Sequence, residues 1–261
     1  MMTNNMFMKI IYQKRWLIFW WFVALVGTGL STTVLFPAFK GSNIGQVFNS
    51  LPTSVQHIAG TASGFNSIGN YISQEVFGLR APLLTIVLSI VVFNSLTVNE
   101  ERQGILETQI SLPLSRSKIF LSKLIAGILI ICIASAGLFV GVELALFFIH
   151  DHYSATKLLE LVLNSAVFGI IFGLVLFMLN AVFGIRGIVL GLSCAYAFIS
   201  YLLTSFALTQ KNLQTFDKGS LFHYYSSTGN FYIHDLLTLI YIGLGLIFIS
   251  YIFFTKRDIE T

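Results

Sequence analysis

The sequence predicts an all-α, polytopic membrane protein, a single transmembrane domain over residues 1–261 with six transmembrane helices and both termini in the cytoplasm. Three observations lead to this prediction: the composition, six long apolar runs and an uneven distribution of basic residues. Of the 261 residues, 56% are hydrophobic and only 10% are charged, whereas an ordinary soluble domain carries about 25% charged residues. The composition therefore excludes a water-soluble globular domain.

Six apolar runs are each long enough to cross the hydrocarbon core of a bilayer, which takes about 20 residues of helix. They cover residues 16–36, 81–98, 124–149, 161–183, 187–208 and 236–254. The first run follows Lys14 and Arg15, as the apolar part of a signal peptide would, but it is too long for one and no small-residue cleavage site follows it. We expect it to remain as the first transmembrane helix.

The basic residues orient the six helices. Cytoplasmic loops of membrane proteins are enriched in Lys and Arg, and the chain has fifteen such residues. The side that holds both termini carries Lys9, Lys14, Arg15, Arg102, Arg116, Lys118, Lys123, Arg186, Lys256 and Arg257. The termini are therefore predicted in the cytoplasm, and the chain in the plasma membrane among its lipids. The same enrichment accounts for the net charge of +4 without a nucleic-acid partner.

The segments outside the spans are predicted to be associated with the membrane surface. Residues 1–15 place apolar side chains on one helical face, which predicts a short helix on the inner surface. The extracellular segment 37–80 has apolar residues at helical spacing between residues 44 and 58, so we expect one or two amphipathic helices there. The second extracellular segment, 209–235, is rich in aromatic residues and is expected to dip into the outer interface.

A charged insert at residues 99–118, between the second and third spans, is the most informative segment. Thr97 and Glu100 have the spacing of a capping box, which predicts the start of a helix. Glu100 and Glu101 fall in its first turn, where carboxylates stabilise the positive end of the helix dipole.

Pro113 ends this predicted helix, because the residue before a proline disfavours helical backbone. Ser115 is then placed to cap the helix that leads into the third span. The result is a cytoplasmic helix of about three turns. The pattern fits an ordinary amphipathic surface helix equally well.

Several motifs of catalysis are missing from the sequence. There is no Gly-x-x-x-x-Gly-Lys-Ser/Thr loop to hold nucleotide phosphates, and no His-Glu-x-x-His or Gly-x-Ser-x-Gly motif. Cys132 and Cys194 lie in separate apolar runs, which favours neither a disulfide nor a metal site. We predict that the chain is not an enzyme, binds no cofactor or metal itself, and draws energy for any active transport from a partner.

Glu143 is the only charged residue inside the predicted spans. A carboxylate at the centre of a bilayer costs about 2.5–3.5 kcal/mol, so such residues are often functional. Because Glu143 lies near the outer end of its span, three roles fit it: a structural polar contact, a place in a substrate pathway, or a proton-coupled site.

The run Glu101-Arg-Gln-Gly-Ile-Leu-Glu-Thr108, followed by Leu112-Pro-Leu-Ser-Arg116 and Lys123, resembles the signature of ABC-2 type permeases of ABC transporters. In that family a glutamate, a Gly-Thr-Leu-Glu sequence, a Pro-x-Ser-Arg sequence and a lysine lie between spans 2 and 3. This chain has Ile105 where threonine is usual. Weaker matches before the second and sixth spans and at the C terminus extend the resemblance over nearly the whole chain.

The resemblance implies that the insert is a coupling helix, which docks in a groove of a separate cytoplasmic ATPase subunit. The implied docking residues are Glu100, Glu101, Gly104, Glu107, Pro113 and Arg116, with a minor contact from Arg186 in the short turn between spans 4 and 5. ATP and Mg²⁺ are then expected on the ATPase. A second permease subunit, identical or related, is expected to complete the translocation path.

The expected function is therefore that of the permease subunit of an ATP-driven exporter. The aromatic outer segments favour an amphipathic or hydrophobic cargo, such as a drug, an antibiotic peptide or a lipid, although such segments also serve as interface anchors. Two alternatives remain open. One is a membrane immunity or sensor protein that does not transport, and the other is a proton-coupled carrier that works through Glu143.

Overall fold

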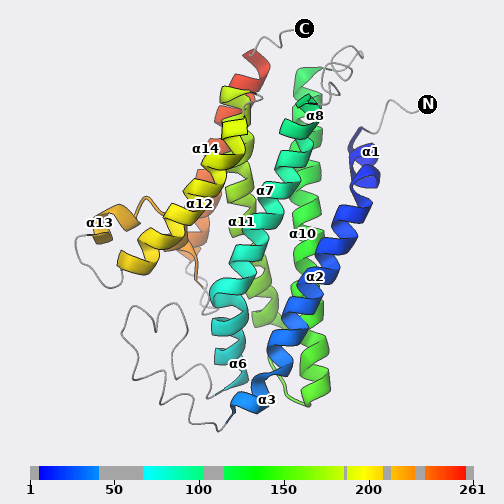
Figure 1. Cartoon of the computed structure of the whole chain (residues 1–261), viewed down its shortest axis with the longest axis vertical. Helices are drawn as coiled ribbons and strands as arrows, with labels where there is room; N and C mark the ends of the chain where they lie inside the picture. The colour runs from blue at the N-terminus through cyan, green and yellow to red at the C-terminus, as the bar shows by residue number, and fades with distance from the viewer. Residues whose placement is uncertain are drawn as a thin grey trace.

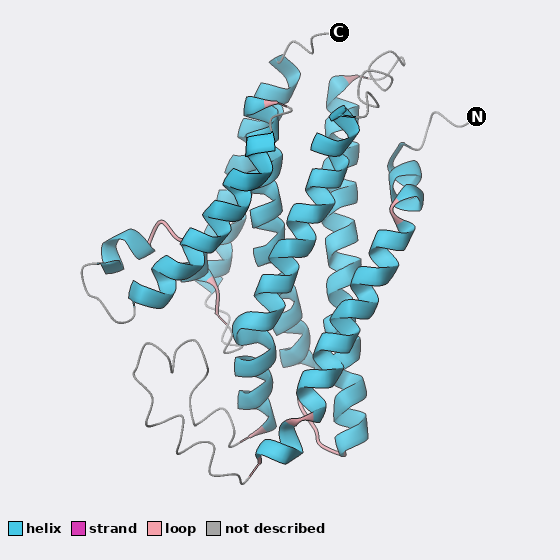
Figure 2. Cartoon of the chain, in the orientation of Figure 1, coloured by secondary structure: helices cyan, strands magenta, loops and turns pink. Residues whose placement is uncertain are grey.

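The computed structural model describes residues 6–40, 67–102, 115–184, 187–207, 213–226 and 233–256. Within these ranges all regular structure is helical (Figure 2). Six of the described helices are long and apolar enough to cross a membrane, which confirms the predicted all-α, multi-pass class. They run over Arg15–Phe39, Ile68–Glu100, Arg116–Ile149, Ala155–Phe183, Ile188–Ala207 and His234–Lys256.

The described α-helices are α1 (Met6–Gln13), α2 (Arg15–Val34), α3 (Phe36–Phe39), α6 (Ile68–Tyr71), α7 (Ala81–Leu96), α8 (Val98–Arg102), α10 (Arg116–Ile149), α11 (Ala155–Phe183), α12 (Gly187–Ala207), α13 (Gln214–Asp217) and α14 (Ile233–Lys256). A π-helix (Ile72–Arg80) and a 3₁₀-helix (Leu221–Tyr224) complete the list. Helices α1 and α8 and the end of α14 lie at one end of the bundle (Figure 1), which we call the termini end. Its location in the cytoplasm stays a prediction.

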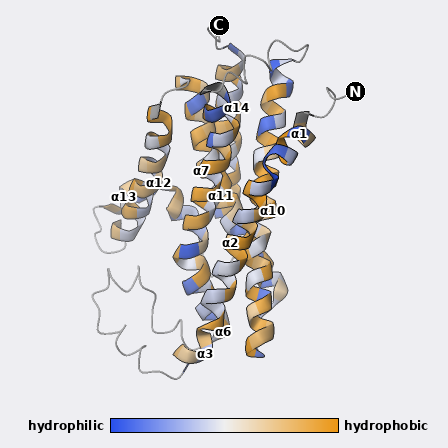
Figure 3. Ribbon diagram, turned by 45° about the vertical axis from the view of Figure 1, so that its right-hand side comes forward, coloured by the Kyte–Doolittle hydropathy of each residue, from blue (hydrophilic) through white to orange (hydrophobic). Residues whose placement is uncertain are grey.

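Helices α7 and α11 are at the centre of the bundle, and α12 and α14 are at its edge. Only 17% of the apolar stretch of α12 and of α14 is buried within the chain, compared with 61% for the second and fourth spans. Apolar residues run along the long helices, and Figure 3 shows hydrophilic residues both near the termini end and in the lower part of the bundle below α7. This distribution is the one expected of helices surrounded by lipid.

Helix α10 packs directly against the backbone of α2 through two glycines four residues apart. A Cβ atom on Gly137 would lie 2.6 Å from the carbonyl oxygen of Phe22, and a Cβ on Gly141 would overlap the backbone of Val26. Small residues at this spacing share one helix face and let transmembrane helices approach closely. The glycines therefore determine where α10 crosses α2.

A second pair of glycines brings α11 against α7. A Cβ on Gly169 would lie 2.7 Å from the carbonyl oxygen of Thr85, and Gly173 lies against the side chains of Ser89 and Phe93. The Phe93 ring also fills the space beside Gly127 of α10. Helix α7 is thus held between α10 and α11 by close contacts.

The second transmembrane helix begins earlier than predicted. The prediction started it at residue 81 and assigned the residues up to Arg80 to the extracellular segment. In the structure the helix begins at Ile68, where the Ser67 side chain accepts a hydrogen bond of 3.3 Å from the backbone N–H of Asn70. The remainder of that prediction, the amphipathic helices around residues 44–58, lies outside the described residues.

Pro82 explains the unusual geometry of this extension. Within the π-helix the N–H of Ala81 donates to the carbonyl of Val76, five residues earlier. A proline has no N–H, and in an α-helix its ring clashes with the carbonyl four residues before it. Because the wider π-helical turn ends at Arg80, two residues before Pro82, we infer that this turn lets the helix continue through the proline.

Two charged residues in the extension neutralise each other. The Arg80 guanidinium lies 3.0 Å from the Glu75 carboxylate and donates a further bond to the Glu75 carbonyl. The two residues are five positions apart, which the π-helical turn brings together on one face. The charges therefore do not interrupt the helix.

Two further predictions have clear outcomes. Helix α1 forms within residues 1–15, but its Ile10 is buried and it packs on α10; its contact with the membrane surface stays a prediction. Helices α11 and α12 are joined by a short turn and lie in contact, as predicted. Gly184 in that turn has φ 73°, a backbone conformation that favours glycine.

Replacing Gly141 and Gly191 by alanine is expected to shift stability in opposite directions. A Cβ on Gly191 meets nothing within 4 Å, so Gly191→Ala should stabilise the helix by about 0.5–1 kcal/mol. Gly141→Ala should instead destabilise the bundle by about 1–3 kcal/mol, because the new methyl group overlaps α2. Thermal unfolding in detergent measures both, and equal stabilisation by the two variants would contradict the close contact.

Candidate functional site

The insert begins and ends at the termini end of the bundle, where α8 and the start of α10 lie. Helix α8 follows α7 after a break at Thr97. Several predicted docking residues, Gly104, Glu107, Pro113 and Arg186, lie outside the described residues, as does the side chain of Glu101. Glu100 and Arg116 remain, and both are held in contacts of this chain.

Glu100 forms a buried ion pair with Lys123 of α10. The carboxylate and ammonium are 2.8 Å apart, and the two side chains are 8% and 3% exposed. Charged side chains are almost never buried unless they are paired. The carboxylate of Glu100, predicted to take part in docking, therefore points into the bundle and fastens α8 to α10 at the base of the insert.

Lys14 is a third charge beside this pair. Its ammonium group donates to the carbonyl of Ser95 at 3.2 Å, which links the start of α2 to the end of α7. Burial lowers the pKa of Lys14 from 10.5; the Glu100 carboxylate opposes this shift, and the Lys123 ammonium adds to it. We call Lys14, Glu100 and Lys123 the ionic cluster. Within it, the ion pair joins α8 to α10, and Lys14 joins the start of α2 to the end of α7.

The helix start that the capping box predicts is present, because α8 begins at Val98, directly after Thr97. The N–H and the hydroxyl of Thr97 both donate to the carbonyl of Phe93, at 3.0 and 2.7 Å. The Glu100 carboxylate binds Lys123 instead of the Thr97 N–H. Neutralising a buried ammonium outweighs a local capping bond, because an unpaired buried charge costs several kcal/mol. The predicted cap at Ser115 is confirmed by a 3.3 Å bond from the Lys118 N–H.

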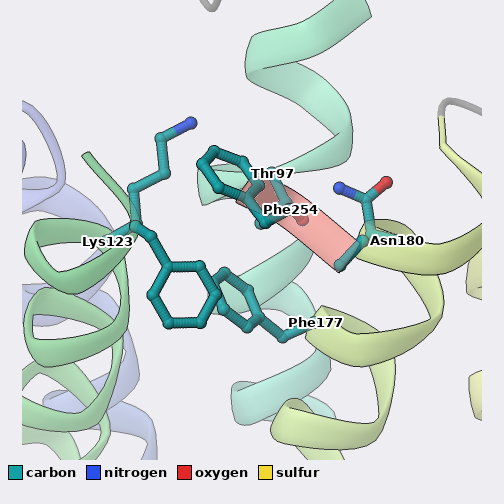
Figure 4. Close-up of a pocket in the computed structure, with 7 residues that line it drawn as sticks. Thr97, Lys123, Phe177, Asn180 and Phe254 are labelled. Atoms are coloured by element: carbon teal, nitrogen blue, oxygen red, sulfur yellow. The ribbon is translucent and has the colours of Figure 1, made fainter. Parts of the chain in front are cut away.

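A small pocket lies beside Lys123. Its lining is mixed, with polar groups opposite phenylalanine rings: Thr97, Phe120, Lys123, Phe177, Asn180, Ala181 and Phe254 (Figure 4). The cavity volume is about 10 Å³, on the order of a single water molecule. The pocket is therefore suited to solvating Lys123 and not to holding cargo.

The start of α10 is also fastened to the end of α14. Arg116, another predicted docking residue, donates to the carbonyl of Thr255 at 3.3 Å. The hydroxyls of Ser117 and Tyr251 are 2.9 Å apart, and the Phe120 ring packs edge-on against Tyr251. Both flanks of the insert are thus attached to neighbouring helices.

Glu143 lies on α10, half-buried. Its Oε1 atom is buried and has no hydrogen-bond partner within the described part of the chain. The sequence left three roles open for Glu143: a structural polar contact, a place in a substrate pathway or a proton-coupled site. Among the described residues, no structural polar contact is made by this oxygen. Sequence reasoning identified the residue but not its surroundings.

Sequence reasoning missed the ionic cluster. Lys123 was counted only as one of the cytoplasmic bases and as part of the family pattern. The signal that could have identified it is its position: Lys123 lies one turn after Ile119 and one turn before Ala126 and Gly127, all of them buried. A lysine on the apolar face of a helix requires a buried partner.

No protein-family model matches this chain, and no curated protein is significantly similar to it. The resemblance to ABC-2 type permeases therefore stays a prediction from the sequence motif.

Removing one partner of the ion pair is expected to destabilise the protein more than removing both charges. Lys123→Met leaves the Glu100 carboxylate buried without its partner and should cost about 3–5 kcal/mol. Adding Glu100→Gln removes the stranded charge and should recover most of that loss. Thermal unfolding of the single and double variants measures the coupling, and simple additivity of the two losses would contradict a buried pair.

Proposed function

We propose that this chain is the membrane-spanning subunit of an ATP-driven exporter of the ABC-2 type, which moves amphipathic or hydrophobic molecules out of the cell. The observation that carries the proposal is the insert at residues 99–118. It resembles a coupling helix in sequence, and it emerges from a base in which a buried ion pair joins its two flanking helices.

A force on the insert reaches several helices at once. Glu100 connects α8 to α10, and Lys14 connects the start of α2 to the end of α7, the helix that α8 follows. Arg116 connects the start of α10 to the end of α14. In the proposed mechanism, closure of the ATPase subunits on ATP pushes the insert, and these contacts transmit the movement to the bundle. The bundle then changes between inward-facing and outward-facing arrangements.

The proposed transporter contains a second permease subunit, identical or related to this one. Helices α12 and α14 support this, because only 17% of the apolar stretch of each is buried within the chain. The pocket beside Lys123 is too small for cargo, so the translocation path is proposed to lie between the two permease subunits. Each of them docks one ATPase.

Reversing an acidic charge of the insert is expected to weaken the binding of the ATPase to this chain. The tagged wild-type chain, purified in mild detergent from its native host, should carry along an ATPase with a phosphate-binding loop. Glu101→Arg and Glu107→Arg should lower this capture tenfold or more, which corresponds to a loss of about 1.4 kcal/mol. The matched control is Lys157→Glu, an exposed residue near the start of α11, at the opposite end of the bundle. The exporter proposal would be contradicted if no ATPase were captured. It would also be contradicted if all variants captured the ATPase and transported equally.

A proton-coupled carrier is the second candidate, favoured by the buried Oε1 of Glu143 without a described partner. The two candidates differ in what Glu143→Gln does. For the exporter, ATP-driven transport should survive the substitution within about threefold, since glutamine keeps the shape and loses only the charge. Transport in vesicles that persists without ATP, collapses with the proton gradient and disappears in Glu143→Gln would establish the carrier instead.

A further inference from the structure

Helices α1 and α2 present one continuous face away from the bundle. Lys14, between them, keeps the helical hydrogen bonds: its N–H donates to the carbonyl of Ile10, and its carbonyl accepts from the N–H of Ile18, both at 3.0 Å. The two helices therefore share one register across their junction. They lie at the edge of the bundle (Figure 1), and only 28% of the apolar stretch of the first span is buried within the chain.

Large aromatic and apolar side chains cover this outward face. Helical positions three, four and seven residues apart fall on one side, because each residue turns the helix by about 100°. Five side chains with this spacing are between 50% and 66% exposed, and we call them the exposed stripe: Met8, Tyr12, Trp16, Phe19 and Trp20. The opposite side packs on the bundle through the buried Ile10 and Leu25.

Two basic side chains lie on the same face as the exposed stripe. Lys9 and Arg15 are both exposed. Lys9 lies seven residues before Trp16, and Arg15 lies seven residues after Met8, a separation of two helical turns that returns to the same side. Lys14 is different, because it lies on the inward side and belongs to the ionic cluster.

The chain does not neutralise these two outward charges. The first 74 residues contain no Asp or Glu, and within the described part of the chain neither Lys9 nor Arg15 forms an ion pair. The Arg15 guanidinium lies over the Tyr12 ring, 4.2 Å from its centroid. Stacking of this kind leaves the N–H donors at the rim of the guanidinium, in the fork that matches a phosphate group. An anion on this face would therefore find oriented donors.

The distances along the helix match the layers of a membrane surface. Arg15 and Trp20 are five residues apart, about 7.5 Å along the axis. The headgroup layer on each side of a hydrocarbon core is about 5–8 Å deep. If Arg15 lies at the level of the phosphates, Trp20 lies at the boundary of the hydrocarbon core, where Trp side chains concentrate.

We propose that Lys9, Arg15 and the exposed stripe form a binding site for an acidic phospholipid in the leaflet at the termini end. The lipid phosphate accepts hydrogen bonds from Arg15 and is attracted by Lys9, and an acyl chain lies along Trp16 and Trp20. The two uncompensated charges select an acidic headgroup over a zwitterionic one, as basic clusters beside a transmembrane helix do. The lipid is a bound partner and not a cargo, so this inference does not depend on the proposed function.

Tryptophan fluorescence tests the proposal, because all three tryptophans of the chain lie in this segment. Trp21 packs on the bundle and is replaced by phenylalanine, so that Trp16 and Trp20 alone report on the site. This parent variant is reconstituted in phosphatidylcholine vesicles that contain a minor fraction of phosphatidylglycerol. In one preparation the phosphatidylglycerol carries bromine on its acyl chains, and in the other an equal amount of phosphatidylcholine does. Bromine quenches the fluorescence of nearby tryptophans.

Brominated phosphatidylglycerol should quench the parent variant about threefold more than the same amount of brominated phosphatidylcholine. Lys9→Gln with Arg15→Gln should make the two lipids equal. The matched control is Lys118→Gln with Lys256→Gln, which removes the same charge from exposed side chains of α10 and α14 and should keep the preference. Equal quenching of the parent variant by both lipids, or an equal loss of preference in the control, would overturn the proposal.

A second pair of variants tests the orientation of Arg15. Tyr12→Leu keeps both charges and removes the ring on which the guanidinium lies, so the preference should fall about twofold. Tyr241→Leu removes a ring on α14 that is 69% exposed and should keep the preference. An equal preference in these two variants contradicts the proposal.

A second copy of this chain is the alternative occupant of the exposed stripe. It would cover Trp16 and Trp20 and keep both brominated lipids away from them. Weak quenching by both lipids would therefore overturn the proposal in favour of a protein partner. None of these measurements involves an ATPase, so the lipid site and the proposed exporter stand or fall separately.

Discussion

Two pairs of helices cross with glycines of one helix directly against the other helix, and the remaining helices are arranged around these crossings. Between helices in lipid there is little hydrophobic driving force, so association relies on close van der Waals packing. Gly137 and Gly141 provide it between α10 and α2, and Gly169 and Gly173 provide it between α11 and α7. Helices α12 and α14 lie at the edge. Helix α14 packs on α11, and α12 is held by its contact with α11 and by polar bonds to the 213–226 segment.

The glycine crossings also make the ionic cluster necessary. Once α10 is fixed against α2 and α7, the face of α10 that carries Lys123 is buried. An isolated ammonium in that position would cost several kcal/mol, and Glu100 of α8, which follows α7 after Thr97, offsets this cost. A packing constraint in the bundle thus sets the position from which the insert leaves the membrane domain.

The six spans could be predicted from the sequence because a bilayer tolerates only helices with internally satisfied backbones, and hydropathy reports their length. The start of the second helix, at Ile68, could not be predicted from the sequence. Glu75, Arg80 and Pro82 are loop signals in an α-helical register, and only a π-helical turn pairs the two charges. The Ser115 cap is a local interaction and was predictable. The pair of Glu100 with Lys123 depends on two helices meeting across the insert, which no spacing rule encodes. The ring contacts around Phe222 are equally non-local, so aromatic content predicted an interface anchor and not a buried aromatic cluster.

Helix α7 connects the base of the insert to the π-helix at the opposite end of the second span. One end continues from the π-helix that presents the Phe77 carbonyl to Tyr225, and the other leads through Thr97 to Glu100. Its 16 residues span about 24 Å, and close contacts with α10 and α11 along that length keep it from bending. In the proposed exporter, a displacement of Glu100 by the insert passes through Lys123 to α10 and through Thr97 to α7, whose other end continues into the π-helix.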